Sequence, residues 1–302
     1  MSIRRRGPCP SEHRAGRNRD VFWRRWEQRV PVLTYHAHQI TGATYETNDL
    51  EAFRTDLRTI RRLGFRIVPA LWVAEWLTGS RSRRDLRRSV AITFDDGSDF
   101  DFRDLEHPGA GPQRSVLRSL REFCAEAGTE AARHASVTSF VIASPQVRAE
   151  LDAACLVGRG WMSDDWWPVA QASGLVAIGN HSWDHNHPEA SRTCQREQRK
   201  GAFDAIETEA ECDAEVVDAA RYIAHRTGRW PVLFAYPGGT ASHYLRACYL
   251  PEHGARHGTL AAFAADGGYV TRESSRWFVQ RFVCGAHWRD PSGLEEILRG
   301  AR

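Results

Sequence analysis

Short apolar segments alternate with segments of helical periodicity along most of the chain. The apolar segments "PVLTYH", "SVAITF" and "LVAIGNH" have the length of buried strands. Between the first two, Phe53, Leu57 and Ile60 recur at helical spacing before Gly64, a residue that commonly ends a helix. Strands that alternate with helices in this way are typical of an α/β protein with a mostly parallel sheet. The pattern predicts this fold class.

Polar side chains follow directly after several of the predicted strands. His36, the pair Asp95 and Asp96, His181 and Tyr236 all stand at such positions. In parallel α/β folds the carboxyl ends of the strands meet on one face, and functional sites are built there. We therefore expect these residues to share one site.

Two longer segments carry predictions of their own. Residues 201–228 predict one long helix, with Gly228 beyond its end. Residues 98–113 are mostly polar and contain "HPGAGP", which predicts a long loop, and long loops in compact domains are often functional. Near the end, "WFVQRFVCGAHW" predicts a late strand and "SGLEEILRG" a closing helix.

Composition excludes some classes of protein. The 302 residues are 42% hydrophobic, enough to bury a sizeable core in one large domain or in two. A net charge of +3, from 41 basic and 38 acidic residues, argues against a dedicated nucleic-acid binder. Seven scattered cysteines without a C-x-x-C pair suggest neither a zinc knuckle nor a disulfide framework.

The N-terminus reads as a tail. Residues 1–28 are predicted to be disordered or irregular, and they begin with basic residues but lack the apolar centre of a signal peptide. No window approaches the roughly 18 apolar residues of a membrane span. As written, the chain is expected in the cytoplasm, unless its start codon is assigned too far upstream or export uses another route.

Asp95 and Asp96 stand side by side at the end of a predicted buried strand, where burying one charge is already costly. Successive side chains of a strand point to opposite faces, so one aspartate could bind a cation while the other stays free. A nearby metal would offset the cost of burying both. An Asp-Gly pair is also a common turn signal, and this stretch alone does not decide between the two interpretations.

Three histidines, His181, His185 and His187, cluster after another strand. A lone histidine is more often structural, but His181 and His185 are four residues apart, and a helical turn would place both rings on one side. Together with Asp96 they form a His₂-Asp set that suits zinc and leaves a position open for water and substrate. The pattern indicates a catalytic metal site.

"TFDDG" followed by "HSWDH" resembles the first two motifs of the polysaccharide deacetylases, the NodB-homology group or carbohydrate esterase family 4. The segments "PVLTYH", "TSFVIA" and "LFAYPGG" resemble other family segments in the same order, so the resemblance covers roughly His36 to the C-terminus. It implies a distorted (β/α) barrel of roughly seven parallel strands, with residues 29–302 as the catalytic domain. It also implies a divalent metal, usually zinc, and removal of N-acetyl (less often O-acetyl) groups from a carbohydrate polymer or oligomer.

The resemblance also implies roles for individual residues. Asp95 would be the general base. Backbone N–H groups after "AYP" would help to hold the oxyanion. The implied metal ligands are Asp96, His181 and His185, and the implied substrate-binding residues are Tyr236, Pro237 and Gly238.

Two positions depart from the family pattern. The third motif usually carries an arginine that orients the base, but Ala235 stands there, and Arg281 in "FVQRFV" is the candidate substitute unless it is a surface arginine. The last motif usually supplies a histidine as general acid. His287 in "CGAHW" is the slightly favoured candidate and His36 the alternative.

Further residues near the motifs have open roles. His187 could be a third histidine ligand, although a solvated side chain is the better interpretation. The family pattern does not include the acids Asp99, Asp101 and Asp104, which could shape the substrate groove or simply form a solvated acidic loop.

Two alternative functions compete with the deacetylase. A haloacid-dehalogenase-like phosphohydrolase would need its two acids separated by one residue, and Phe94 occupies the position that this spacing requires. A non-catalytic carbohydrate-binding protein on the same fold is compatible with the altered third and last motifs. The expected partner of the deacetylase is an acetylated glycan, whose identity and N- or O-linkage the sequence leaves open.

Overall fold

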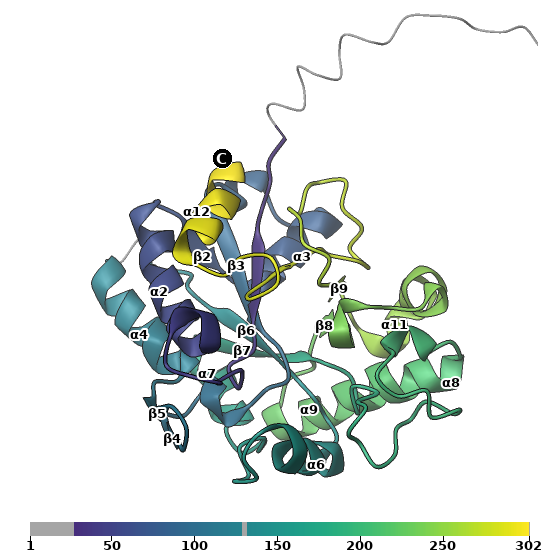
Figure 1. The fold of residues 1–302 in the computed structure, drawn as a ribbon. Coiled ribbons are helices and arrows are strands. Elements are labelled where there is room, and N and C mark those ends of the chain that lie inside the picture. Colours follow the sequence, from purple (N-terminus) through teal and green to yellow (C-terminus); the bar gives the residue numbers. More distant parts are fainter. Residues whose placement is uncertain (1–26, 129–131, 302) are drawn as a thin grey trace, which may run out of the picture.

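The structure is a computed structural model that describes residues 27–128 and 132–301 (Figure 1). The predicted tail, residues 1–28, lies outside the described residues except for its last two. Within the described ranges, no helix is both long enough and apolar enough to cross a membrane.

The predicted parallel α/β fold is confirmed. An eight-stranded sheet curls into a distorted barrel, and seven of its strands form one continuous path of parallel neighbours. In spatial order these are β10 (Phe282–Val283), β1 (Val32–Tyr35), β3 (Ser89–Phe94), β6 (Val137–Val141), β7 (Val176–Asn180), β8 (Leu233–Ala235) and β9 (Ala261–Phe263). The eighth strand, β2 (Arg66–Val68), pairs with the beginning of β3.

The segment around β10 joins the two ends of this path. Val279 pairs with Phe263 of β9, and Phe282 pairs with Leu33 of β1. One short stretch therefore contacts both edges of the curled sheet, and Arg281 lies in its middle. The late strand predicted over "WFVQRFVCGAHW" shrinks to the two residues of β10.

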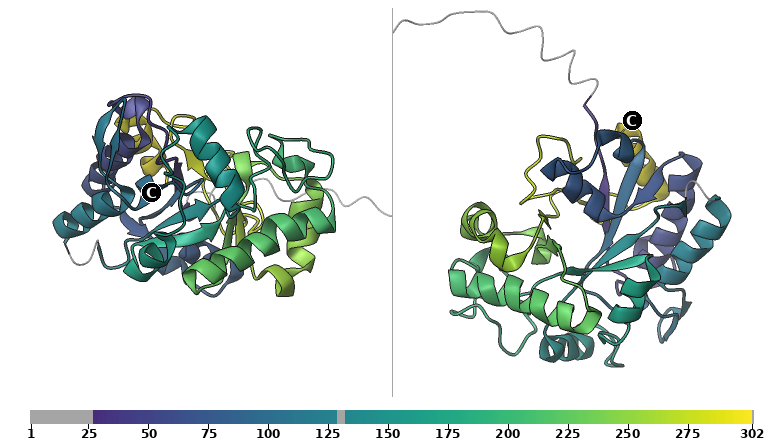
Figure 2. Two further views of the ribbon diagram at one scale, coloured as in Figure 1. Left: turned by 90° about the horizontal axis from the view of Figure 1, so that it is seen from below. Right: turned by 180° about the vertical axis from the view of Figure 1, so that it is seen from behind.

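Helices cover the outside of the barrel (Figures 1 and 2). Helix α2 packs between α4 and α12, and α7 and α9 pack on β7. The α-helices of the described chain are α2 (Asp49–Arg62), α3 (Ala70–Thr78), α4 (Val116–Ala127), α6 (Pro145–Cys155), α7 (Trp167–Ser173), α8 (Glu209–Cys212), α9 (Ala219–Thr227), α10 (Leu250–Glu252), α11 (Gly254–His257) and α12 (Pro291–Gly300). Shorter helical segments are η2 (Tyr45–Thr47), η3 (Arg83–Leu86), η4 (Asp99–Asp101), η5 (Phe203–Ala205), η7 (Pro237–Gly239) and the π-helical η6 (Asp213–Asp218) and η8 (Leu245–Tyr249).

Helix α2 shows how the local sequence sets an element. The Asn48 side chain accepts hydrogen bonds from the N–H groups of Leu50 and Glu51 and so satisfies the open N-terminus of the helix. Phe53, Leu57 and Ile60 are buried, and they belong to the main apolar core that also includes residues of α4 and α12. The spacing that predicted the helix is therefore the face that packs on the sheet.

Two sequence predictions about connecting segments were wrong. Residues 201–228 do not form one helix, because the chain passes through η5 and a loop before Thr208 caps the continuous run of α8, η6 and α9. Residues 98–113 are not only a loop: η4 is followed by a hairpin of β4 (Leu105–His107) and β5 (Gly111–Gln113).

Candidate active site

A cavity of about 480 Å³ opens at the carboxyl ends of the parallel strands. Its walls come from the ends of β1, β3 and β7 and from the turn after β8. The lining residues are His36, His38, Gln39, Ile40, Thr41, Asp95, Asp96, Cys155, His181, His185, His187, Gly238, Gly239, Ala265 and Val283.

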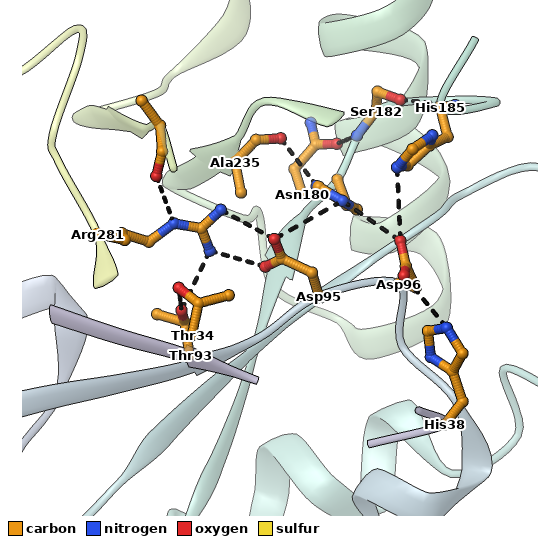
Figure 3. Close-up of polar contacts among 12 residues, drawn as sticks. Thr34, His38, Thr93, Asp95, Asp96, Asn180, Ser182, His185, Ala235 and Arg281 are labelled. Atoms are coloured by element: carbon orange, nitrogen blue, oxygen red, sulfur yellow. Dashed lines mark hydrogen bonds and ion pairs between the residues drawn. The ribbon is translucent and has the colours of Figure 1, made fainter. Parts of the chain in front are cut away.

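The turn after β3 separates the two adjacent carboxylates. Asp95 continues the strand, and its N–H donates to the Tyr35 carbonyl at 3.1 Å. Asp96 and Gly97 then both take left-handed backbone conformations, with φ of 74° and 75°. The Asp95 side chain consequently points towards Arg281, and that of Asp96 towards the histidines (Figure 3). The stretch is thus both a turn and part of a site.

Arg281 holds Asp95 from the closing segment of the barrel (Figure 3). Its guanidinium donates to both carboxylate oxygens, at 2.7 and 2.8 Å, while Nε donates to the Ala264 carbonyl at 2.8 Å. The arginine is fully buried, so it is not a surface residue. Burial raises the pKa of Asp95, but Arg281 and then His181 lower it more, so that this carboxyl stays ionised.

His181 and His185 face the same oxygen of Asp96. Their Nε2 atoms lie 3.4 and 3.5 Å from Asp96 Oδ1, and their ring centres are 5.0 Å apart. His181 Nδ1 donates to the Ala235 carbonyl at 2.9 Å, which directs Nε2 at Asp96. Burial lowers the pKa of His181, but Asp95 and Asp96 raise it more. Burial lowers the pKa of His185 to about 3 although Asp96 opposes this, so the ring is neutral, as a metal ligand must be.

The helical turn expected between these histidines does not form. Ser182 and His185 have φ of 72° and 64°, and the segment is a tight turn with left-handed residues. Asn180 supports it, because its Oδ1 accepts from the Ser182 N–H at 2.9 Å and its Nδ2 donates to the Val216 carbonyl at 2.9 Å. The two rings still converge, by a different backbone path.

The donor set suits a divalent metal. One ligand atom each from Asp96, His181 and His185 lies within 4.8 Å of the other two. Two imidazole nitrogens and one carboxylate oxygen are typical of catalytic zinc, which keeps a position open for water. These residues are the ones that could hold the metal.

Of the two candidate general acids, only His36 lies in the cavity. His287 is exposed, its Nδ1 accepts a hydrogen bond from the Val283 N–H at 2.9 Å, and its ring packs against Phe282. The chain turns at Gly285, with φ of 78°, and so carries His287 out of the cavity. This position does not suit a general acid, so His36 is the better placed of the two candidates, and the identity of the general acid stays a prediction.

One cavity histidine was missed by the sequence reasoning. His38 Nε2 lies 3.6 Å from Asp96 Oδ2, on the side opposite His185 (Figure 3). The available signal was its position two residues after His36 in "YHAHQ", at the end of the first strand. His187 also lines the cavity, half-buried at its rim.

The third-motif residues lie differently from one another. Tyr236 is buried in the core, where its N–H donates to the Phe263 carbonyl at 2.9 Å and its hydroxyl donates to the Trp277 carbonyl at 2.6 Å. Pro237 is buried as well. Gly238 lines the cavity as the second residue of the short helix η7, where an N–H has no partner within the helix.

The acidic residues after the first motif do not line the cavity. Asp99 accepts hydrogen bonds from the N–H and hydroxyl of Ser163, both at 2.8 Å. Asp101 is buried and accepts from the Ser139 hydroxyl. Asp104 binds Ser115 at the start of α4 and pairs with Arg118. These carboxylates anchor the segments around the site.

Comparison with known proteins agrees with this architecture. The model of the polysaccharide deacetylase family matches residues 82–255, more than half of the 302-residue chain. A comparison with curated proteins found no match. Among solved structures, the deacetylase PplD from Streptococcus pyogenes, in complex with acetate, is 14% identical with a TM-score of 0.60, over 90% of this chain and 99% of that one.

Two further structures are similar. IcaB from Ammonifex degensii is 19% identical with a TM-score of 0.58, over 91% of this chain and 97% of that one. BC0361, a polysaccharide deacetylase from Bacillus cereus, is 14% identical with a TM-score of 0.56, over 85% of this chain. The match covers 65% of the BC0361 chain, so this chain spans less than two thirds of that relative.

Fold and cavity together define a (β/α)-barrel protein with a His₂-Asp cluster at the carboxyl ends of its strands. The chain belongs to the polysaccharide deacetylase family.

Proposed function

We propose that this protein is a metal-dependent hydrolase that removes acetyl groups, chiefly N-acetyl groups, from a carbohydrate polymer or oligomer. The observation that carries the proposal is the combination of Asp96, His181 and His185 with the buried Asp95–Arg281 pair in one cavity. We take residues 29–302 as the catalytic unit. The family and the acetate-bound PplD structure support the acetyl chemistry.

The metal, with zinc as the expected ion, would be held by Asp96, His181 and His185. When bound, it supplies a water of lowered pKa and polarises the acetyl carbonyl. Asp95 accepts the proton of the attacking water. Arg281 keeps that carboxylate ionised and fixes its orientation by two hydrogen bonds. The Asp95 carboxylate is therefore held in a single orientation towards the attacking water.

Two further groups complete the reaction. The Gly238 N–H, on the cavity wall, donates to the oxyanion of the tetrahedral intermediate. His36 donates a proton to the leaving sugar nitrogen, so that an amine and acetate are released. His36 replaces His287 in this role because it lines the same cavity as Asp95.

The cavity lining favours an uncharged sugar. Among residues 27–128 and 132–301, those that line it include no lysine or arginine, although the chain holds 41 basic residues. An anionic glycan would lack a cationic partner there. We propose a neutral N-acetylated glycan as substrate.

Release of acetate tests the function directly. Purified full-length protein is incubated with neutral and anionic N-acetylated glycans and with O-acetylated glycans, with and without a chelator, and acetate is measured. We expect release from neutral N-acetylated glycans that stops with chelator and returns with zinc. Bound metal without acetate release from any glycan would instead favour the carbohydrate-binding alternative.

A further inference from the structure

A second cluster of ligand-type side chains lies behind the turn that carries His181 and His185. Asp184 belongs to that turn, Cys194 to the following loop and Glu215 to the π-helical segment η6. One ligand atom from each lies within 4.8 Å of the other two. Among the described residues, two groups of three meet this condition, this one and the candidate active site.

The two carboxylates of this cluster are deeply buried. Glu215 is 0% exposed and Asp184 is 2% exposed. None of the ion pairs among the described residues involves either of them. Two ionised carboxylates without a counter-charge cost several kcal/mol each in such a place. The pair therefore needs either a shared proton or a cation.

The hydrogen bonds leave one oxygen available. Glu215 Oε2 accepts from the N–H groups of Trp183 and Asp184, at 3.0 and 3.3 Å. Asp184 accepts from the N–H groups of Asn186 and Cys194, at 2.8 and 2.6 Å. Glu215 Oε1 is buried and has no hydrogen-bond partner. A buried oxygen of this kind calls for an explanation, and an absent ion is one.

Cys194 is the member of the cluster that lines a cavity. A cavity of about 580 Å³ is lined by Trp183, Cys194 and Tyr222, together with Asp218 and His225. Cys194 is half-buried at this cavity and forms the outer side of the cluster. The π-helical widening of η6 brings Glu215 to its inner side, and such irregular turns often occur at functional sites.

We propose that Asp184, Cys194 and Glu215 bind a second divalent cation of the zinc type, which fastens the turn bearing His181 and His185. One thiolate sulfur and two carboxylate oxygens are common zinc ligands, and water would fill the fourth position. On binding, the Cys194 thiol loses its proton to solvent as the metal–sulfur bond forms, and a proton shared by the carboxyl pair leaves as well. The site lies outside the candidate active site, and its existence does not depend on the proposed function.

The first test is the number of zinc ions bound per chain. Full-length protein dialysed against zinc should hold two equivalents per chain. A His181→Ala/His185→Ala variant removes two ligands of the candidate active site and should keep one equivalent. Addition of Cys194→Ser and Glu215→Gln should remove that equivalent too. One equivalent in the unaltered protein and none in the double histidine variant would overturn the second site and leave the proposed function intact.

Cobalt substitution identifies the sulfur ligand without relying on activity. None of the three ligands of the candidate active site is a cysteine, so a thiolate-to-cobalt charge-transfer band in the near ultraviolet that does not depend on Cys155 would report on Cys194. The band should vanish in Cys194→Ser and persist in Cys155→Ser, a matched control because Cys155 lines the other cavity. No band in the unaltered protein, or a band that survives Cys194→Ser, would mean that the carboxyl pair simply shares a proton.

Discussion

At the scale of single residues, Asp95 is the side chain on which the proposed chemistry depends most. A positioned general base contributes about 10²- to 10⁴-fold to the rate. We expect Asp95→Asn to lower kcat for acetate release by about this factor while bound metal is unchanged. Asp104→Asn is the matched control, because Asp104 belongs to the same acidic stretch but binds Ser115 outside the cavity. Equal losses in both variants would contradict the role of Asp95.

Arg281 should matter to stability as well as to activity. Arg281→Gln leaves a buried carboxylate without its partner, which costs about 3–5 kcal/mol in the free energy of unfolding at pH 7. The partner lowers the pKa of Asp95, so its stabilisation is present above the unfolded-state pKa of about 3.9 and is lost as pH falls through the lower folded-state pKa. The free energies of unfolding of the unaltered protein and of Arg281→Gln, measured in urea, should therefore approach each other as pH falls. A difference that stays constant down to pH 3 would contradict this account.

The sequence could predict which residues share the site where the local backbone path does not decide the outcome. Asp95, Asp96, His181 and His185 follow strands, and the ends of parallel strands converge, so their proximity was expected and the structure shows it. Arg281 was predicted as a partner of Asp95 and lies against it. The exposed position of His287 could not be predicted, because the turn at Gly285 decides where that side chain points. The catalytic roles themselves remain predictions.

At the scale of elements, the turn between β3 and η4 depends on Gly97. A Cβ at this position would lie 2.5 Å from Val141 Cγ1 and 2.9 Å from the Val141 Cα, and the φ of 75° already disfavours other residues. Gly97→Ala should therefore cost more than the roughly 1–2 kcal/mol of left-handed strain alone, and it should displace Asp96 and weaken metal binding. Urea unfolding and metal titration measure the two effects.

Gly111→Ala isolates the strain from the clash. Gly111 has a φ of 70° in the β4–β5 hairpin, with nothing within 4 Å of an added Cβ. The Gly111→Ala variant should be less stable by only the roughly 1–2 kcal/mol that left-handed strain costs, and it should keep its metal. If the two variants are equally stable, contact with Val141 does not explain the requirement for glycine.

Element boundaries were harder to predict than element types. The alternation of apolar segments gave the strands and helix α2, because burial of a repeating face determines both. The predicted helix over residues 201–228 was wrong, since its apolar spacing cannot reveal that Thr208 caps a later start or that η6 widens to bring Glu215 inward. Such irregularities arise from tertiary contacts, here those of Glu215 with the turn that carries His181 and His185.

At the scale of the whole molecule, a buried hydrogen-bonded cluster links the beginning and the end of the barrel. It consists of Asp56, Tyr35, Tyr45 and Trp288 and is called the clasp below. Asp56 of α2 is 0% exposed and accepts hydrogen bonds from the Tyr35 and Tyr45 hydroxyls, at 2.8 and 2.7 Å, and from Trp288 Nε1 at 3.0 Å. Asp56 and Trp288 are 232 residues apart in the chain. Local patterns carry no information on a contact of this span, which is why the closure of the barrel could be expected only from the family resemblance.

The clasp should give the fold an unusual dependence on pH. Burial raises the pKa of Asp56 to about 7, against the opposing hydrogen bonds from Tyr45, Tyr35 and Trp288. Because the folded-state pKa exceeds the unfolded value of about 3.9, the folded state binds more protons between these values. The contribution of Asp56 to stability is fully present below pH 4 and is lost as pH rises through 7.

Asp56→Asn removes this titration while keeping the size of the side chain. We expect the variant to lack the decline in the free energy of unfolding between pH 4 and pH 7 that Asp56 causes, measured by urea unfolding across that range. The same change at Asp85, which lies at the surface beside Arg81, should leave the decline in place. If Asp56→Asn declines as steeply as the unaltered protein, Asp56 is ionised throughout, and the clasp is held by charge-assisted hydrogen bonds instead.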